Sequence, residues 1–107
     1  MVAPLLARLV RPVVRRGVVE GHSMIPAYVP GERIWLLRRL RPLRVGDVVA
    51  FSLPDDIDLT AIKRVAALRG RFVTLLGDNA DASRDSREFG PVSIREIHWL
   101  VRPQRGA

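Results

Sequence analysis

The sequence predicts a compact, mostly β protein with strongly bent strands, and three observations support this fold class. The chain has 107 residues, which is the usual size of one domain. A hydrophobic fraction of 48% is enough for one modest core and does not indicate disorder. From Val13 onward, short runs of valine, isoleucine and leucine alternate with glycine, proline and aspartate turn signals. No repeat, low-complexity tract or linker divides the sequence, so we expect a single domain over residues 1–107.

Residues 1–16 form a basic, amphipathic N-terminal segment. Apolar residues at helical spacing predict a short helix or irregular segment over residues 4–11, bounded by Pro4 and Pro12. Such a segment suits peripheral contact with an anionic membrane. The apolar run over residues 2–7 is far shorter than the ~20 residues that cross a bilayer. We therefore expect no transmembrane segment, and a protein that is cytoplasmic or peripheral to a membrane.

Six strands are expected after this segment, because each apolar run is bounded by turn signals. Their ranges are 13–20, 33–37, 47–53, 60–68, 71–76 and 97–102. Two connections have a strong charge bias. Residues 38–44 predict an exposed basic loop, and residues 54–58 predict an acidic one.

The charge of the chain is unevenly placed. The formal net charge is +7, and residues 1–44 account for all of it, with nine arginines against Glu20 and Glu32. A basic patch suits nucleic acid, an anionic membrane or an acidic partner, and an arginine-rich solvated face explains it equally well. No aromatic residues are interleaved with the charge, so nucleic acid is not expected. Without cysteine, the chain has no thiol nucleophile, disulfide or cysteine-based zinc site.

Ser23 is a candidate nucleophile, because it follows an apolar run in residues 21–26, Gly-His-Ser-Met-Ile-Pro. A serine at such a junction can expose its hydroxyl, although many such serines only cap a turn. His22 adjoins Ser23 and should point to the opposite face of an extended chain. His98 is expected to be a partly buried structural residue in a late strand. Neither histidine predicts a triad, and their spacing does not predict a metal site.

Lys63 is the better candidate base. Of 18 basic residues, 17 are arginine and only Lys63 is lysine. Arginine cannot lose its proton at usable pH, whereas a lysine that is removed from water can. Lys63 lies in an apolar strand pattern that would allow this desolvation. The alternative is a lysine at a strand edge with its ammonium in water.

A polar region follows the predicted strand at 71–76. It contains Gly-Asp-Asn at 77–79, Ser-Arg-Asp-Ser-Arg at 83–87 and Phe-Gly-Pro-Val at 89–92. On its own it predicts a loop in which Asp85 and Arg87 form a local ion pair.

Taken in order, these blocks resemble the motifs of the S26 (signal peptidase I) family of serine–lysine endopeptidases. The resemblance covers residues 18–102 and includes Gly-Asp-Val-Val at 46–49 and Lys-Arg-Val at 63–65. It implies a β-barrel or sandwich of the signal-peptidase and LexA-like type. It also implies a serine endopeptidase that removes an N-terminal leader or signal peptide from a precursor protein. The polar blocks after residue 76 favour this family over LexA-type repressors.

The resemblance assigns roles by position. Ser23 would attack the scissile carbonyl, neutral Lys63 would accept its proton, and Ser83 would hydrogen-bond and orient the lysine amine. The remaining supporting residues would be Asp78, Asn79, Asp85 and Arg87, of which Asp85 and Arg87 pair beneath the site.

The resemblance also implies how substrate binds. The precursor would dock as an extended strand beside residues 18–22 and the Lys63 strand. Gly21, Met24 and Pro26 would contribute to substrate binding, with Met24 lining a pocket for a small side chain. The Ser23 backbone N–H would hold the oxyanion. Serine–lysine chemistry implies no cofactor and no metal.

Three readings of the function stay open. The short length and the expected lack of an anchor are similar to the nickel-type superoxide dismutase maturation proteases, which remove a leader from a cytoplasmic precursor. A membrane-associated signal peptidase I acting on secreted preproteins is the first alternative. The second is a non-catalytic β domain of this family that binds peptides.

Overall fold

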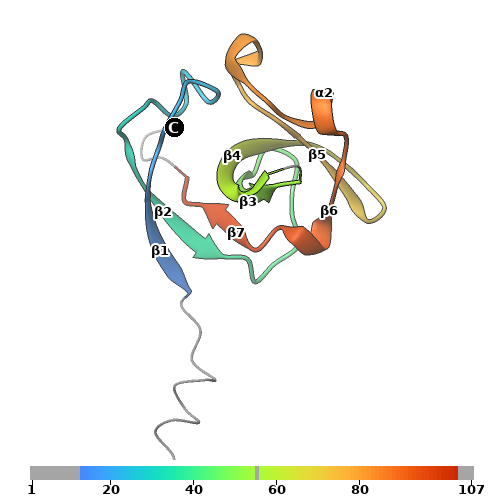
Figure 1. The fold of residues 1–107 in the computed structure, drawn as a ribbon. Helices are drawn as coiled ribbons and strands as arrows, with labels where there is room; N and C mark the ends of the chain where they lie inside the picture. The colour runs from blue at the N-terminus through green and yellow to red at the C-terminus, as the bar shows by residue number, and fades with distance from the viewer. Residues whose placement is uncertain (1–12, 55, 104–107) are drawn as a thin grey trace, which may run out of the picture.

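The computed structural model describes residues 13–54 and 56–103, and seven strands form its main body (Figure 1). The expected helix over residues 4–11 lies outside these residues. The strands are β1 (Val14–Val18), β2 (Arg33–Arg38), β3 (Val48–Leu53), β4 (Asp56–Arg69), β5 (Phe72–Leu76), β6 (Val92–Ser93) and β7 (Trp99–Val101). The expected mostly β fold is confirmed.

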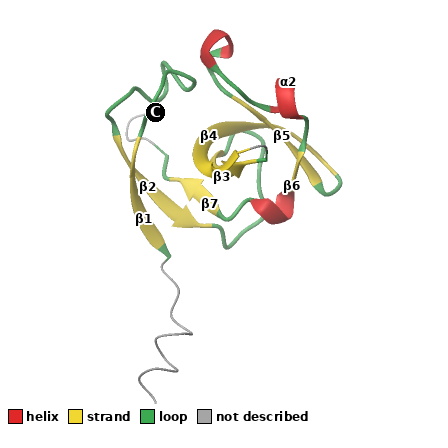
Figure 2. Cartoon of the chain, viewed as in Figure 1, coloured by secondary structure: helices red, strands yellow, loops and turns green. Residues whose placement is uncertain are grey.

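All seven strands belong to one antiparallel sheet in the order β1-β2-β7-β3-β4-β5-β6. The last strand, β7, lies between β2 and β3, so the end of the chain joins the two halves of the sheet. The sheet curls instead of lying flat (Figure 2). Curling of this kind follows from strand twist and from the register shifts between β3 and β4 and between β4 and β5.

Two of the open strand edges matter for the site. β1 pairs with β2 alone among the described strands. β4 pairs with β3 along its first part, and with β5 only from Arg64 onward. Therefore the second edge of β4 before Arg64 has no strand partner in the described part of the chain.

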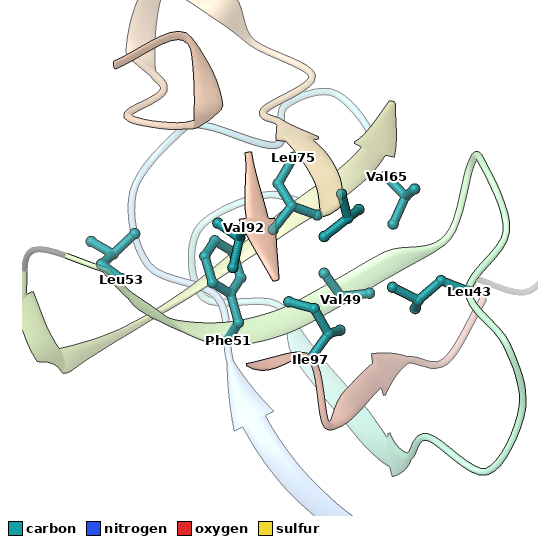
Figure 3. Packing of buried hydrophobic residues seen from close by; sticks show 9 residues of the cluster. Leu43, Val49, Phe51, Leu53, Val65, Leu75, Val92 and Ile97 are labelled. Carbon is teal, nitrogen blue, oxygen red and sulfur yellow. The ribbon is translucent and has the colours of Figure 1, made fainter. Parts of the chain in front are cut away.

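The core consists of two clusters of buried apolar residues. The larger one lies around β3 and β5, and Figure 3 shows how its side chains meet between the strands. Its members are Leu43, Val49, Phe51, Leu53, Val65, Val73, Leu75, Val92 and Ile97. The smaller one lies beside β1, β2 and β7 and contains Val19, Met24, Tyr28, Ile34, Val48 and Val101. β3 is buried at all but one position because strands flank it on both sides.

Short helices occupy the polar region after β5. They are η1 (Ala80–Ala82), α2 (Ser86–Phe89) and η2 (Ile94–Glu96), of which η1 and η2 are single 3₁₀ turns. α2 begins where the Asp85 side chain accepts a hydrogen bond from the Arg87 backbone N–H, a typical N-cap contact. No helix in the described part of the chain has the length and apolar character to span a bilayer.

Several expectations about the connections were wrong. β4 begins at Asp56, so most of the expected acidic loop belongs to a strand. The expected basic loop is not fully exposed either, because Leu43 is buried. Arg39 in the same loop donates hydrogen bonds to the carbonyl oxygens of Ile97 and Ile94. The two-residue strand β6 was not predicted, because so short a strand has no periodicity to read.

The first testable prediction concerns the core. Leu75 is 0% exposed, so Leu75→Ala should lower the free energy of unfolding by about 2–5 kcal/mol through lost burial and a residual cavity. Leu59→Ala is the matched control, because Leu59 is 52% exposed and its truncation should cost less than about 1 kcal/mol. Urea unfolding measures both, and equal losses would contradict the assigned core.

Candidate active site

The structure brings the side chains of Ser23 and Lys63 into contact. Lys63 Nζ donates a hydrogen bond to Ser23 Oγ at 2.9 Å. Ser23 lies in the turn after β1, and Lys63 lies in β4, 40 residues further along the chain. The predicted contact is therefore confirmed. It joins a strand and a turn that lie far apart in the sequence.

Lys63 is buried, with 5% of its surface exposed. It forms no ion pair with any residue that the structure describes. Burial lowers the pKa of the Lys63 amine below its ordinary value, and the negative charge of Asp85 opposes this shift only in part. The alternative of a strand-edge lysine with its ammonium in water is therefore wrong.

Backbone hydrogen bonds hold the turn that carries Ser23. The Asn79 N–H donates to the Ser23 carbonyl at 2.8 Å, and the Asn79 side-chain amide donates to the His22 carbonyl at 3.0 Å. Met24 is 1% exposed and anchors the turn in the smaller core cluster. The Tyr28 N–H donates to the Met24 carbonyl and closes the turn. Asn79 thus supports the turn that carries the nucleophile, through the backbone carbonyls of His22 and Ser23.

The backbone N–H of Ser23 has no hydrogen-bond acceptor among residues 13–54 and 56–103. An N–H that is free at the nucleophile can serve an oxyanion. Gly21, two residues earlier, has φ of +73°, a conformation that favours glycine. This glycine lets the chain turn sharply between β1 and Ser23.

A buried carboxylate, Asp85, lies beneath the site. It is 0% exposed and accepts hydrogen bonds from the Gly77 N–H at 2.8 Å and the Ser83 hydroxyl at 2.6 Å. It also accepts from the Arg87 guanidinium on both carboxylate oxygens. Burial alone would raise the pKa of Asp85, but the hydrogen bonds from Arg87, Ser83 and Gly77 outweigh burial and hold the pKa well below its usual range. The Asp85–Arg87 ion pair expected from the sequence is present.

The expected hydrogen bond from Ser83 to the Lys63 amine is absent among the described residues. The Ser83 hydroxyl donates to Asp85 Oδ2 instead. An ionised carboxylate is a stronger acceptor than an amine that is a hydrogen-bond donor itself, and it lies two residues away on the same loop. Ser83 therefore acts on Asp85, and any effect on Lys63 is indirect.

Gly77 is needed because the chain is too crowded there for a side chain. A Cβ atom at this position would lie 2.1 Å from Ser83 Oγ and 2.7 Å from the Ser23 carbonyl oxygen. Only glycine allows the β5 end, the Ser23 turn and the Ser83 loop to meet. Sequence reasoning placed Gly77 in a turn and missed this close approach.

The Arg64–Asp78 ion pair was also missed. The Arg64 guanidinium donates to both carboxylate oxygens of Asp78 at 2.8 Å, and to the Gly46 carbonyl at 2.9 Å. These residues flank Lys63 and Gly77 in sequence, so the pair ties the lysine strand to the loop beneath the site. The sequence shows that Arg64 adjoins Lys63, but it does not show that Arg64 pairs with Asp78, because only the fold brings the two together.

A cavity of about 420 Å³ opens beside Ser23 and Lys63. Its walls come from residues 16–20 before the nucleophile, from Ile34 and Leu36 of β2, and from residues 60–63 of β4. The open edges of β1 and β4 therefore both border this cavity. The lining is mostly small or apolar and includes Ala50 and Ala61, so it has room for an extended chain with apolar side chains.

The substrate-binding residues expected from the resemblance lie outside the lining of this cavity. None of Gly21, Met24 and Pro26 is among the described residues that line this cavity. Met24 is packed in the core, and Pro26 is exposed in the turn after it. Turn residues next to a nucleophile look accessible in sequence, but the turn here folds back onto the core.

The two histidines take no part in the contact between Ser23 and Lys63. His22 is exposed, and His98 is also exposed just before β7, so the expected partly buried strand position of His98 was wrong. Within the described ranges, no group of three or more histidine, aspartate or glutamate side chains could hold a metal ion.

Comparison with known proteins identifies the family. The family model described as signal peptidase, peptidase S26, matches residues 1–75. The chain therefore belongs to the signal peptidase S26 family.

Several relatives share this similarity. A mouse protein named mitochondrial inner membrane protease subunit 2 is 32% identical, over 75% of this chain and 60% of its own. An Arabidopsis thaliana protein named mitochondrial ATP-independent inner membrane protease subunit 1b is 31% identical, over 78% of this chain and 67% of its own. A Schizosaccharomyces pombe protein named mitochondrial inner membrane protease subunit 1 is 31% identical, over 78% of this chain and 68% of its own. This chain thus spans between 60% and 68% of the length of these relatives.

We expect Gly77→Ala to disrupt the site, because its Cβ would meet the Ser23 backbone oxygen at 2.7 Å and that atom cannot move aside cheaply. The free energy of unfolding should fall by about 1–3 kcal/mol or more. Gly17→Ala is the control, since its Cβ would lie 3.3 Å from a flexible Ile34 side chain and should cost little. Adding Ser83→Gly to Gly77→Ala should recover only part of the loss. Full stability of Gly77→Ala alone in thermal unfolding would refute the crowding.

A third prediction follows from the lowered pKa of Asp85. The unfolded chain, with an Asp pKa of ~3.9, binds this proton more readily than the folded protein, so stability falls as pH drops below about 5. Asp85→Asn should be less stable at neutral pH and should lose part of this acid slope. Asp81→Asn, at an exposed position, should keep the parent slope. Thermal unfolding between about pH 2 and pH 7 measures the effect, and parallel curves for all three proteins would count against it.

Proposed function

We propose that this protein is a serine endopeptidase that removes a leader or signal peptide from a precursor protein, with Ser23 as nucleophile and Lys63 as general base. One observation carries the proposal: the 2.9 Å contact between Ser23 Oγ and the buried Lys63 Nζ. A hydroxyl and an amine at this distance can exchange a proton. The family membership supports the same reaction class.

Burial of the lysine makes the chemistry feasible. At an ordinary pKa of ~10.4, only about one lysine in 2,500 is neutral at pH 7. Desolvation lowers the pKa of Lys63 and so raises the neutral fraction. In the neutral state the Ser23 hydroxyl donates to Nζ across the same 2.9 Å contact.

The reaction then follows in two halves. Ser23 Oγ attacks the scissile carbonyl carbon as its proton passes to Lys63 Nζ, and the Ser23 N–H stabilises the oxyanion. The Lys63 ammonium returns the proton to the leaving amine as the peptide bond breaks. Water attacks the acyl-enzyme in the second half, with Lys63 again accepting and returning a proton, and Ser23 is regenerated.

The precursor would bind as an added strand between the open edges of β1 and β4. Residues 16–20 and 60–63 line the cavity from these two sides. Unpaired backbone N–H and C=O groups on both strands can pair with an extended peptide. Gly17, Ala50 and Ala61 leave room beside the nucleophile for a side chain of the peptide.

The buried loop network has a positioning role in this proposal. Asp85 forms no ion pair with Lys63 among the described residues, but its negative charge partly offsets the loss of hydration of the ammonium. Arg87 and Ser83 hold Asp85 in place, and Asn79 holds the Ser23 turn.

The names of the relatives bear on location and substrate. They are named as inner membrane protease subunits, which supports an association of this protein with a membrane. They give no support for a nickel superoxide dismutase precursor as the substrate. A leader peptide on a precursor met at a membrane is the substrate class we propose.

The decisive substitution is Lys63→Arg. Arginine keeps the positive charge but cannot deprotonate at usable pH, so cleavage of a leader-containing peptide should fall by about 10²–10⁴-fold. The rate of the parent should rise with pH through the lowered Lys63 pKa, and the variant should lack this limb. Ser23→Ala is the control for loss of the nucleophile.

Thermal unfolding of all three proteins separates catalysis from folding. A folded Lys63→Arg protein that cleaves at the parent rate would disprove the general-base role. A parent protein that binds leader peptides but cleaves none would leave only the non-catalytic peptide-binding function.

A further inference from the structure

We propose that a second cavity, next to the active-site cavity, binds an acidic side chain of the precursor at a distance from the scissile bond. The inference deepens the proposed peptidase function and rests on it. The second cavity has a volume of about 540 Å³. Its lining residues are Arg16, Gly17, Val18, Arg33, Ile34 and Trp35.

The two cavities share part of their wall along β1. Arg16, Gly17, Val18 and Ile34 line both of them. Gly17 lines both cavities, and a Cβ there would already lie 3.3 Å from Ile34 Cγ1, so any larger side chain would crowd this shared wall. A peptide that lies along the open edge of β1 therefore has side chains within reach of both cavities.

The second cavity has two positively charged side chains in its wall and no negatively charged one among the described residues. Neither Arg16 nor Arg33 forms an ion pair with any residue that the structure describes, and no described lining residue is acidic. Arg64 and Arg87 show the contrast, because each binds a carboxylate on both oxygens. Two arginines that share a cavity wall without a counter-ion favour an anionic ligand.

Trp35 holds Arg16 in place without neutralising it. The Arg16 guanidinium stacks over the Trp35 ring at 4.8 Å from the ring centroid. Stacking on an aromatic face leaves the N–H donors at the edge of the guanidinium free for a carboxylate. The fold thus presents a preoriented donor, which reduces the entropic cost of binding.

The charge along β1 changes sign toward the nucleophile. Glu20 lines the active-site cavity at the Ser23 end, and Arg16 lies at the other end of the same wall. Because a strand advances about 3.3 Å per residue, these positions contact different residues of a bound peptide. An acidic residue is favoured near Arg16 and disfavoured near Glu20, so the preference should depend on position.

The same arginines could instead meet anionic lipid headgroups. Their place in the wall of the substrate groove favours the peptide, because Arg16 borders the active-site cavity itself. Lipid binding is therefore an alternative that the test must separate.

The test uses the full chain with Ser23→Ala, so that binding is measured without cleavage. Leader peptides carry a single glutamate at each successive position on both sides of the scissile bond, and each is paired with its glutamine analogue. We expect about three- to tenfold tighter binding of the glutamate peptide at a position distant from the bond at low salt, declining as salt screens the exposed arginines. Arg16→Gln with Arg33→Gln should reduce this preference toward one.

Arg69→Gln with Arg71→Gln is the matched control, because it removes two exposed arginines at the β4–β5 turn, away from either cavity. The proposal is overturned if no peptide position shows a preference, or if the preference survives the Arg16 and Arg33 substitutions. It is also overturned if these substitutions weaken sedimentation with anionic vesicles and leave peptide preference unchanged. Failure of the peptidase function looks different, because Ser23→Ala would keep the charge preference while the parent cleaves no peptide.

Discussion

Removal of the Lys63 amine from water is the constraint on which the rest of the site depends. An ammonium is costly to bury, so the fold must supply a dry and rigid position for it. β4 provides that position, because Lys63 pairs with the buried Val49 of β3 and lies one residue before Arg64, where pairing with β5 begins. The result is an amine that is 5% exposed, held against Ser23, with its pKa lowered by burial. A lysine with these properties loses its proton more readily than a surface lysine, and a general base needs this property.

The loop after β5 explains how this arrangement is kept rigid. Asp85 is fully buried and accepts hydrogen bonds from its own loop and from Gly77 after β5, so one carboxylate joins the loop to the end of that strand. Asn79 then joins this loop to the carbonyls beside the nucleophile. Gly77 permits the close approach. Buried networks of this kind are strong when every member is satisfied, and no buried side-chain polar atom in the described residues lacks a partner.

Open strand edges are usually a liability, since they invite pairing with other chains. Here the free edges of β1 and β4 border the same cavity, next to Ser23 and Lys63. The edge pairing that threatens aggregation is the same physical interaction that would hold an extended precursor. The small side chains at the cavity wall leave space close to Ser23, and the wall carries a positive charge at Arg16 and a negative charge at Glu20.

The sequence by itself determined the fold class, most strand positions, the family and the pairing of Ser23 with Lys63. Apolar runs and turn signals are local, and they are sufficient for the fold class and the strands, whereas the family and the pairing followed from the resemblance of several ordered motifs to a known family. Only the tertiary structure decided that Met24 packs in the core, that Ser83 binds Asp85 instead of Lys63, and that Gly77 is needed for close approach. Each depends on how segments distant in sequence meet in space, and neither periodicity nor composition specifies that.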